Sequence, residues 1–332
     1  MKVLGIETSC DETSVAVVEN GKTVLANVIA SSLDIHKQYG GIVPEIATRH
    51  HVEVILPVLE EAIKTSQTSL SEIDLISVTQ GPGLIGSLMI GIIFAKSLSF
   101  ALKKPIIAVD HILSHLYAAC LSNNNIEFPS LGLVVSGGHT SLFLLNSFTD
   151  FKVIGKTRDD ALGEAYDKVA KILNLGFPGG PVIERKANSA KNKELHFTAP
   201  SVKSGYDFSY SGLKTAVLYY TRKLEILDKT KTDEICYAFQ EAALTTLLKQ
   251  VKKTVLDYGI NRMIVGGGVI ANKNLRRKLS DSGLNIYLPE MKYCSDNAGM
   301  VAGLGYELYN KKLGTKINFE PYSTFEEKWE KT

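Results

Sequence analysis

The sequence predicts an α/β protein built from two duplicated domains, and three observations support this. Short runs rich in β-branched residues alternate with stretches of helical periodicity. The order strand, strand, strand, helix, strand, helix, strand begins again after the polar segment 122–129. At 332 residues the chain is too long for one small core. We expect an N-terminal domain at 1–110, a C-terminal domain with helical insertions at 111–332, and a cleft for metal and nucleotide between them.

Local sequence patterns predict the strands and helices of the first part of the chain. Strands are expected at 2–6, 14–18, 23–30, 73–78 and 105–109, and helices at 44–66 and 86–101. Asn20-Gly21 is typical of a turn between two strands. Val52, Ile55 and Leu59 recur at helical spacing, and Pro57 is expected to kink that helix.

The second part repeats this order without useful sequence identity to the first. Strands are expected at 131–136, 141–146, 152–157, 263–265 and 285–288, and helices at 161–173, 212–227, 232–258 and 296–310. The repeated order of elements is therefore what indicates a duplication.

Composition excludes little. A hydrophobic fraction of 45% with 22% charged residues is ordinary for a folded protein. The net charge of +2 neither demands nor excludes a nucleic-acid partner, so RNA binding must depend on local patches. The best candidates are the basic segments 185–193 and 273–278, for which solvated helix faces are the alternative.

Cysteine usage and the apolar segments predict a cytoplasmic protein. The four cysteines are widely spaced and contain no C-x-x-C pair, which is typical of free thiols in a reducing compartment. The start of the chain carries charge within a few residues and has no long apolar core, unlike a signal peptide. The longest apolar stretch, 84–102, is interrupted by glycines, serines and Lys96, which makes it a poor membrane span.

The strongest candidate for chemistry is a histidine pair. His111 and His115 follow a predicted strand and are four residues apart, so on a helix both imidazoles project from one face. This spacing suits two nitrogen ligands of one metal ion, and two histidines with other hydrogen-bond partners are an equally good interpretation. Asp296 is the candidate third ligand, although an aspartate at a helix start is more often a cap. In two domains Asp296 would face the histidines across the cleft, and His139 is a further candidate.

The donor set favours iron or another divalent ion over zinc-protease chemistry. Two histidines and one carboxylate leave coordination positions open for a substrate. In the H-E-x-x-H motif of zinc proteases the catalytic glutamate would fall at Ile112, which cannot act as a base.

Three glycine turns in the second part are candidate nucleotide contacts. They are Ser136-Gly137-Gly138-His139-Thr140, Phe177-Pro178-Gly179-Gly180-Pro181 and Gly266-Gly267-Gly268. Glycines after a strand let backbone N–H groups approach an anion, and a hairpin turn that needs positive φ is the alternative. The P-loop pattern is absent, and G-x-G-x-x-G at 81–86 is a weak signal because Pro82 lacks a backbone donor.

Acidic residues supply further candidates. Asp11 and Glu12 in the first turn are placed to orient a substrate amine or bind a cation, and solvated turn residues are the alternative. Asp167, on a predicted helix, is placed to accept a hydrogen bond from a ligand hydroxyl, although most acids there are expected to serve as caps.

Taken together, the motifs resemble a known family. They occur in its order: Ile6-Glu7-Thr8-Ser9-Cys10-Asp11-Glu12-Thr13, Gly40-Gly41-Ile42-Val43-Pro44-Glu45, His111-Ile112-Leu113-Ser114-His115, Val135-Ser136-Gly137-Gly138-His139-Thr140, Pro178-Gly179-Gly180-Pro181, Ser211-Gly212-Leu213-Lys214, Gly266-Gly267-Gly268-Val269 with Asn272, and Asp296-Asn297. Over nearly its whole length the chain resembles the bacterial TsaD family of tRNA N6-adenosine threonylcarbamoyltransferases, formerly described as glycoproteases. Glu184 stands where an aspartate is usual and Tyr210 where a phenylalanine is common.

The resemblance implies a fold, a reaction and a set of site residues. The fold would be that of the actin-like ATPases, related to sugar kinases and Hsp70. The acyltransferase would move threonylcarbamoyl from threonylcarbamoyl-AMP to N6 of the adenosine 3′ of the anticodon, in tRNAs that read codons starting with A. His111, His115 and Asp296 would bind one divalent metal ion, usually Fe(II), with Zn as the alternative. The adenylate would be bound by Val134, Val135, Ser136, Gly137, Gly138, Asp167, Gly180, Glu184 and Asn272.

The resemblance also implies partners, and we add a hypothesis about the base. A small TsaB-like paralogue, a TsaE-like P-loop ATPase and a separate enzyme that makes the adenylate would act with the chain. Asp11 and Glu12 lie near the expected reacting end, and we expect one of these carboxylates to take the amine proton.

Two alternatives remain at this stage. The first is an ATP-dependent kinase or ATPase of the same fold, which would need no histidine-bound metal. The second is a non-catalytic scaffold, which has no physical need for the histidines, the aspartate and the glycine loops together. The metal content of the purified protein separates the first alternative from the transferase.

Overall fold

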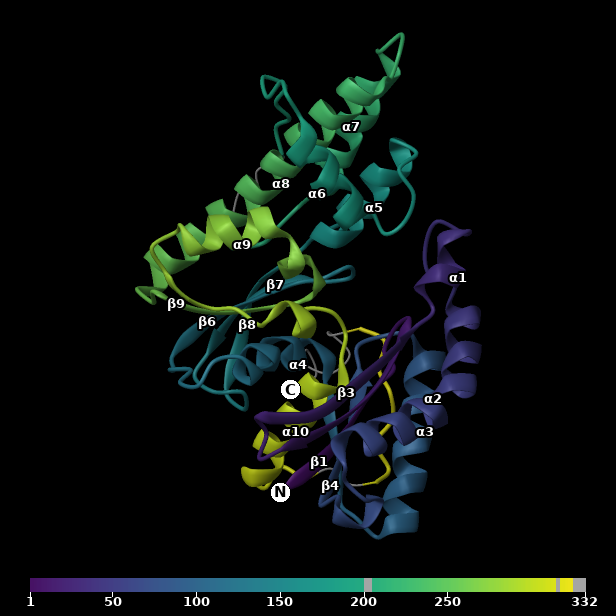
Figure 1. The fold of residues 1–332 in the computed structure, drawn as a ribbon. Helices are drawn as coiled ribbons and strands as arrows, with labels where there is room; N and C mark the ends of the chain where they lie inside the picture. Colours follow the sequence, from purple (N-terminus) through teal and green to yellow (C-terminus); the bar gives the residue numbers. More distant parts are fainter. Residues whose placement is uncertain (200–204, 315–316, 325–332) are drawn as a thin grey trace. The chain divides into compact units, whose positions relative to one another are not determined.

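The chain folds into two compact units. The computed structural model describes residues 1–199, 205–314 and 317–324. Met1–Ile126 and Leu288–Thr332 form the first unit, and Glu127–Tyr287 form the second (Figure 1). The boundary thus lies later than the expected one at residue 110, and the last part of the chain returns to the first unit.

A five-stranded sheet in the order β3-β2-β1-β4-β5 forms the centre of the first unit. Its strands are β1 (Lys2–Glu7), β2 (Glu12–Glu19), β3 (Thr23–Ser31), β4 (Leu75–Gly81) and β5 (Ile106–Asp110). The β1–β2 and β2–β3 pairs are antiparallel, whereas β1–β4 and β4–β5 are parallel. The carboxyl ends of β1, β4 and β5 therefore lie at one edge of this sheet.

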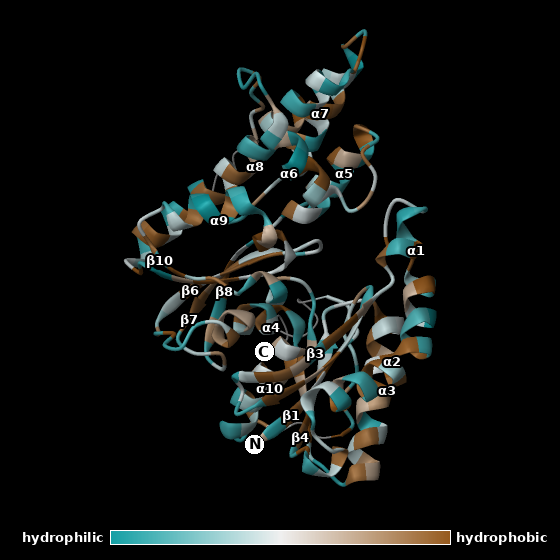
Figure 2. Cartoon of the chain, in the orientation of Figure 1, coloured by the Kyte–Doolittle hydropathy of each residue, from teal (hydrophilic) through white to brown (hydrophobic). Residues whose placement is uncertain are grey.

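Helices cover both faces of this sheet. The helices of the first unit are α1 (Leu33–Lys37), α2 (Pro44–Ser66), α3 (Ile85–Leu102), α4 (His111–Tyr117) and α10 (Ala298–Asn310), with short 3₁₀ turns at Leu70–Glu72, Ala118–Leu121 and Met291–Tyr293. Because side chains alternate along a strand, Leu4 and Ile6 of β1 pack with α2 and α3, and Val3 packs with α10. Figure 2 colours much of α3 and of the strands of this sheet as hydrophobic.

Small residues let α10 approach the sheet closely. A Cβ atom at Gly5 would lie 2.2 Å from the carbonyl oxygen of Ala298, and one at Gly305 would lie 2.2 Å from Ser77 Oγ. Ser77 Oγ donates a hydrogen bond of 2.8 Å to the carbonyl oxygen of Val301. The start of α10 is therefore fixed against β1 and β4.

Helix α3 is apolar enough to raise the question of a membrane. Among the described residues it alone has the length and hydropathy of a spanning helix, and a third of it is buried. Leu88, Ile92 and Ala95 belong to the core of the first unit. The core helix of a folded domain passes the same test of length and composition.

The second unit repeats the sheet of the first. Its strands are β6 (Ser130–Val135), β7 (Thr140–Leu145), β8 (Phe151–Lys156), β9 (Arg262–Gly266) and β10 (Asn285–Tyr287), in the order β10-β9-β6-β7-β8. The β6–β7 and β7–β8 pairs are antiparallel, and β6–β9 and β9–β10 are parallel. The first three strands of each unit thus form a meander to which two parallel strands are added, which confirms the duplication.

Several helices of the second unit differ from expectation. They are α5 (Leu162–Ile172), α6 (Gly179–Ser189), α7 (Ser211–Arg222), α8 (Lys229–Tyr258) and α9 (Lys273–Ser280), with a 3₁₀ turn at Gly268–Ala271. Helix α6 begins inside the Phe177–Pro181 glycine turn, and the prediction of a turn alone was wrong there. Proline is favoured in a first helical turn, so Pro181 was a usable signal. Helix α7 ends at Arg222, five residues before the predicted end.

Candidate metal centre and glycine loops

The two histidines project from a short buried helix. Helix α4 starts directly after β5, and Asp110 caps it by accepting a hydrogen bond of 2.9 Å from the Leu113 N–H. All seven residues of α4 are buried. The end of β5 and this cap therefore fix both imidazoles at the edge of the sheet.

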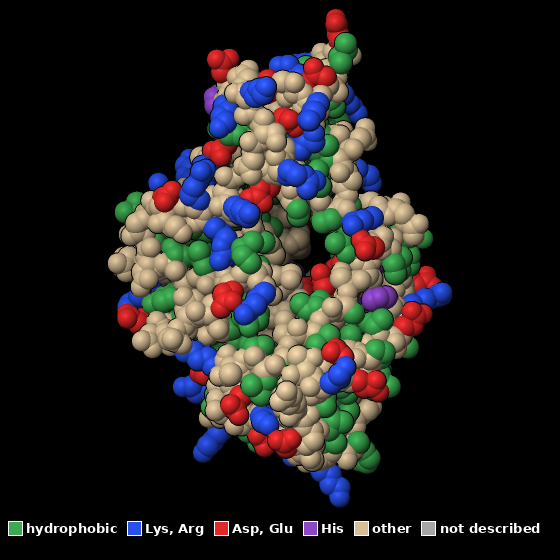
Figure 3. Space-filling view, in the orientation of Figure 1, with side chains coloured by type: hydrophobic (Ala, Val, Ile, Leu, Met, Phe, Trp, Pro, Cys, Tyr) green, Lys and Arg blue, Asp and Glu red, His purple; other side chains and the backbone are tan. Residues whose placement is uncertain are grey.

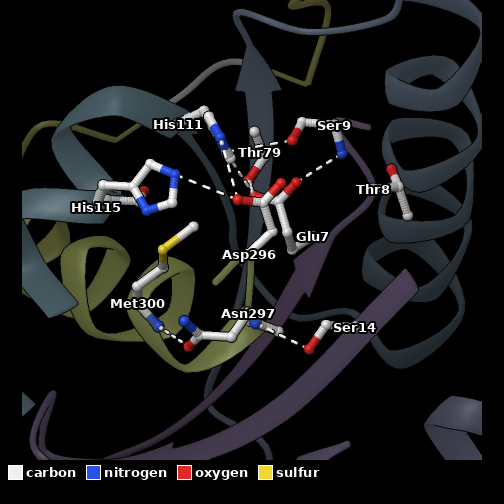
Figure 4. A network of polar contacts seen from close by, with 12 residues as sticks. Glu7, Thr8, Ser9, Ser14, Thr79, His111, His115, Asp296, Asn297 and Met300 are labelled. Atoms are coloured by element: carbon white, nitrogen blue, oxygen red, sulfur yellow. Dashed lines mark hydrogen bonds and ion pairs between the residues drawn. The ribbon is translucent and has the colours of Figure 1, made fainter. Parts of the chain in front are cut away.

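Asp296 lies beside the two imidazoles. The N-cap of α10 is Asn297, whose Oδ1 accepts a hydrogen bond of 3.1 Å from the Met300 N–H, so the cap expected at Asp296 lies one residue later. Asp296 Oδ1 lies 3.2 Å from His115 Nε2 and 3.7 Å from His111 Nε2. Figure 4 shows the carboxylate facing both rings. One ligand atom from each of the three residues lies within 4.8 Å of the others.

These three residues fit a single metal ion. His115 is fully buried; its Nε2 faces Asp296 Oδ1 at 3.2 Å, and its Nδ1 has no hydrogen-bond partner among the described residues. A buried polar atom without a partner costs about 1–3 kcal/mol, so His115 is not an ordinary hydrogen-bonded helix histidine. A divalent ion would use its Nε2 lone pair, and two imidazoles with one carboxylate are an accepted donor set for such an ion.

All three residues belong to the first unit. The expectation that Asp296 would approach from the other domain was wrong, because Leu288–Thr332 returns to the unit that contains α4. His139 lies in the second unit and is not a member of this ligand group.

A buried carboxylate that was not predicted as a site residue lies behind His111. Glu7, at the carboxyl end of β1, is fully buried, and its Oε2 lies 3.0 Å from His111 Nδ1. The same carboxylate accepts hydrogen bonds of 2.6 Å from Thr79 Oγ1 and from the Ser9 N–H. An acid at the end of a buried strand, at the same sheet edge as the histidine helix, was the signal that could have identified it.

Glu7 and His111 stabilise each other's charge. Burial disfavours the Glu7 carboxylate, but the attraction of His111 holds the pKa of Glu7 below its usual value. Burial also disfavours the imidazolium, but Glu7 and then Asp296 raise the pKa of His111 to about 9.

The predicted acidic turn belongs to the same unit. Asp11 is buried and Glu12 partly buried between β1 and β2. Burial, reinforced by repulsion from Asp296 and Asp11, raises the pKa of Glu12 well above its usual value. His51 of α2 holds this turn, because its Nε2 lies 3.0 Å from the Cys10 carbonyl oxygen. The interpretation of Asp11 and Glu12 as simply solvated turn residues is therefore wrong.

The first glycine loop follows β6 in the second unit. The Ser136 N–H donates a hydrogen bond of 2.8 Å to the His139 carbonyl oxygen, and the His139 N–H donates one of 3.1 Å to Ser136 Oγ. Gly137 and Gly138 do not adopt left-handed conformations, and a Cβ at either would have no heavy atom of the described part of the chain within 4 Å. The turn therefore has no conformational need for glycine at these positions. Val134 and Val135 are fully buried in β6.

The other predicted substrate residues connect helices of the second unit. Asp167 Oδ1 accepts a hydrogen bond of 2.7 Å from the Gly179 N–H, and Glu184 Oε1 accepts one of 2.7 Å from the Lys273 N–H. Asn272 caps α9 through the Leu275 N–H, and its Nδ2 donates to Gln240. A Cβ at Gly180 would have no atom within 4 Å among the residues that the structure describes. These residues thus hold α5, α6 and α9 together.

The glycines at 81–86 have a packing explanation. A Cβ at Gly81 would lie 2.3 Å from the Tyr322 carbonyl, one at Gly83 would lie 2.5 Å from the Ser9 carbonyl, and one at Gly86 would lie 2.6 Å from Thr48 Oγ1. The tight turn, rather than dinucleotide binding, accounts for this motif.

Comparison with known proteins identifies the family. The chain matches the family described as TsaD, tRNA N6-adenosine threonylcarbamoyltransferase, over residues 23–303. The chain belongs to this family. A relative of that name from Treponema denticola is 49% identical, with 96% of each chain covered. Another from Thermodesulfovibrio yellowstonii is 48% identical, with 94% of this chain and 95% of the relative covered.

Solved structures confirm the actin-like ATPase fold. HypF from T. kodakarensis has a TM-score of 0.60 at 15% identity, covering 96% of this chain and 49% of that one. Component A of the Acidaminococcus fermentans (R)-2-hydroxyglutaryl-CoA dehydratase has a TM-score of 0.57 at 14% identity, covering 92% and 98%. At such identities the likeness concerns the fold alone.

Proposed function

We propose that this chain is an acyltransferase that moves threonylcarbamoyl from threonylcarbamoyl-AMP to N6 of the adenosine 3′ of the tRNA anticodon, in tRNAs reading codons that start with A. The observation that carries the proposal is the convergence of His111, His115 and Asp296 in a member of this family. The kinase or ATPase alternative gives these residues no role.

One divalent ion would be bound by His111, His115 and Asp296. Two imidazole nitrogens and one carboxylate oxygen suit Fe(II), with Zn as the alternative. Such an ion supplies positive charge against the substrate's phosphate and the developing oxyanion.

The glycine loops of the second unit would bind the adenylate. Ser136, Gly137 and Gly138 follow a buried strand, and no atom of the described residues occupies the space where side chains at these glycines would be. A ligand can therefore approach this backbone closely, as at Gly180. Val134, Val135, Asp167, Glu184 and Asn272 complete the proposed subsite.

The proposed reaction exchanges one bond at the carbamoyl carbon for another and moves one proton. The exocyclic amine of adenosine attacks the carbamoyl carbon, a C–N bond forms, and the C–O bond to the phosphate breaks to release AMP. The amine must lose a proton, and we assign its acceptor to the Asp11–Glu12 pair. Single-turnover transfer that is unchanged by Ala at both positions would contradict this assignment.

A basic surface on the second unit is proposed to bind the tRNA. The two predicted basic segments are adjacent, because Asn274 Nδ2 of α9 donates 2.9 Å to Asn188 Oδ1 of α6. Arg185, Lys191, Lys193, Lys273 and Arg277 are exposed there. Figure 3 shows Lys and Arg side chains gathered over the helices of this unit. Exposed cations on one surface are the usual means of holding phosphates.

An apolar surface on the first unit supports the proposed TsaB-like partner. Val52 and Leu56 on α2 are 58% and 53% exposed, and Met89 and Ile93 on α3 are 44% and 56% exposed. Each pair is spaced by one helical turn, and hydrophobic side chains gather over these helices in Figure 3. A partner would remove this surface from water. The TsaE-like ATPase and the cytoplasmic location rest on the family resemblance and belong to the same proposal.

Transfer of labelled threonylcarbamoyl from its adenylate to unmodified tRNA tests the function. We expect label in tRNA when the purified partners are added, and none in a tRNA with guanosine in place of the acceptor adenosine. His111→Ala with His115→Ala should abolish both bound metal and transfer. Phosphorylation of a small molecule, with no transfer under any of these conditions, would favour the kinase alternative.

A further inference from the structure

The position of the Glu7 carboxylate suggests that it supports binding of the proposed ion. It is fully buried, where an isolated charge is strongly disfavoured, and it is kept there by the Thr79 hydroxyl, the Ser9 N–H and His111. It lies on the Nδ1 side of the His111 ring, whereas Asp296 lies on the Nε2 side. His111 is thus held from one side and presents the other to the ligand group.

We propose that Glu7 is a positioning residue for the metal centre, which fixes the His111 ring with its proton on Nδ1 and its Nε2 lone pair directed at the ion. This inference rests on the metal site of the proposed function. A histidine ligand generally donates its second N–H to a carboxylate or carbonyl, which sets both the tautomer and the ring orientation. The 3.0 Å contact between Glu7 Oε2 and His111 Nδ1 provides this acceptor.

The charges of the site lead to the same conclusion. A divalent ion between His111, His115 and Asp296 would have only one negative ligand among them. The Glu7 carboxylate supplies a second negative charge through His111. Two carboxylates then balance a doubly charged ion in a largely buried site, which reduces the cost of taking that ion out of water.

Glu7→Gln changes the hydrogen-bond pattern with little change of shape. The Ser9 N–H is a fixed donor, so the new amide would turn its oxygen toward it and its NH₂ group toward Thr79 and His111. His111 Nδ1 would then accept instead of donate, and the ring proton would move to Nε2. The lone pair needed for the metal would be blocked.

The test measures metal binding directly. We expect Glu7→Gln to raise the dissociation constant for Co(II) or Zn(II) by about 10- to 100-fold. Competition with a chromophoric chelator measures this constant. Ser9→Ala is the matched control: it removes the longer 3.3 Å contact to His111 but keeps the backbone donor to Glu7, and it should bind metal within about threefold of wild type. The melting temperature of each metal-free variant is measured alongside.

The outcomes separate this inference from the proposed function. If the wild-type protein binds no metal, the proposed function fails, and with it the assignment of Glu7. If wild type and Glu7→Gln bind metal equally, the inference alone is overturned. Should Glu7→Gln not fold, Thr79→Val decides, because it removes a donor from the same carboxylate oxygen. Weakened metal binding in that variant supports the inference, and unchanged binding overturns it.

Discussion

Gly5→Ala is expected to disturb the first unit at the point where its sheet fixes the metal centre. Strand β1 places Gly5 against α10, and α10 begins two residues after Asp296. An added Cβ would lie 2.2 Å from the Ala298 carbonyl oxygen and 2.9 Å from Ala302. Because the nearest atom is backbone, no side-chain rotation can relieve the contact, and the helix must move.

The size of the effect follows from this geometry. Carbon and carbonyl oxygen rarely approach closer than about 3.3 Å, so α10 must shift by roughly 1 Å. Overpacking of a well-packed core costs about 1–3 kcal/mol, and a backbone contact places Gly5→Ala near the upper end. For a domain of this size, about 3 kcal/mol lowers the melting temperature by roughly 6–12 °C.

Calorimetry of the metal-free protein measures this effect. Gly41→Ala is the matched control, because the Gly41 backbone is not left-handed and an added Cβ would have no neighbour within 4 Å in residues 1–199, 205–314 and 317–324. We expect the control to melt within about 2 °C of wild type. Gly5→Ala should also bind metal more weakly, since the shift displaces Asp296. A Gly5→Ala protein that melts like the control would refute the described packing of α10 on β1.

Three further predictions concern other parts of the molecule. Tyr322→Phe removes a hydroxyl that donates a hydrogen bond of 2.5 Å to the buried carboxylate of Asp110. Urea unfolding should show that the free energy of unfolding falls by about 1.5–3 kcal/mol. An unchanged urea midpoint would contradict that hydrogen bond. Burial raises the pKa of Cys236 from 9.0 to about 12, so the stability that the buried neutral thiol contributes is present below pH 9 and is lost as the pH rises toward 12. Alkylation of Cys236 at pH 8.5, followed by mass spectrometry, should therefore be far slower in native than in unfolded protein. Equal rates would contradict the buried position. Arg277→Ala should weaken tRNA binding and lower the slope of log affinity against log salt by about one, measured by filter binding, while an unchanged slope would remove Arg277 from the proposed RNA surface.

The fold was largely predictable because its signals are local. The buried strands of β1, β4 and β5 are runs of apolar residues, and α2 was predicted with the bounds it has in the structure. The duplication was visible in the order of elements, and the matching strand order of the two sheets confirms it. Helix α6 escaped prediction because glycines at its start favour a turn when only local residues are considered.

The candidate site was only partly predictable, since its contacts join distant residues. The spacing of His111 and His115 gave the helix face, but no local pattern showed that residues 288–332 return to the first unit. Glu7 was overlooked because its partner His111 is 104 residues away. Its burial becomes clear only once β1 and β5 lie in one sheet, separated by β4.

Metal titration of the transfer reaction tests the central claim most directly. Protein stripped of metal with a chelator would be supplied anaerobically with increasing Fe(II), together with labelled threonylcarbamoyl-AMP, unmodified tRNA and the partner proteins. We predict that transfer rises from background and reaches its maximum at one equivalent per chain, and that Asp296→Ala stays at background throughout. Full transfer by the stripped protein, with no response to added metal, would contradict the account.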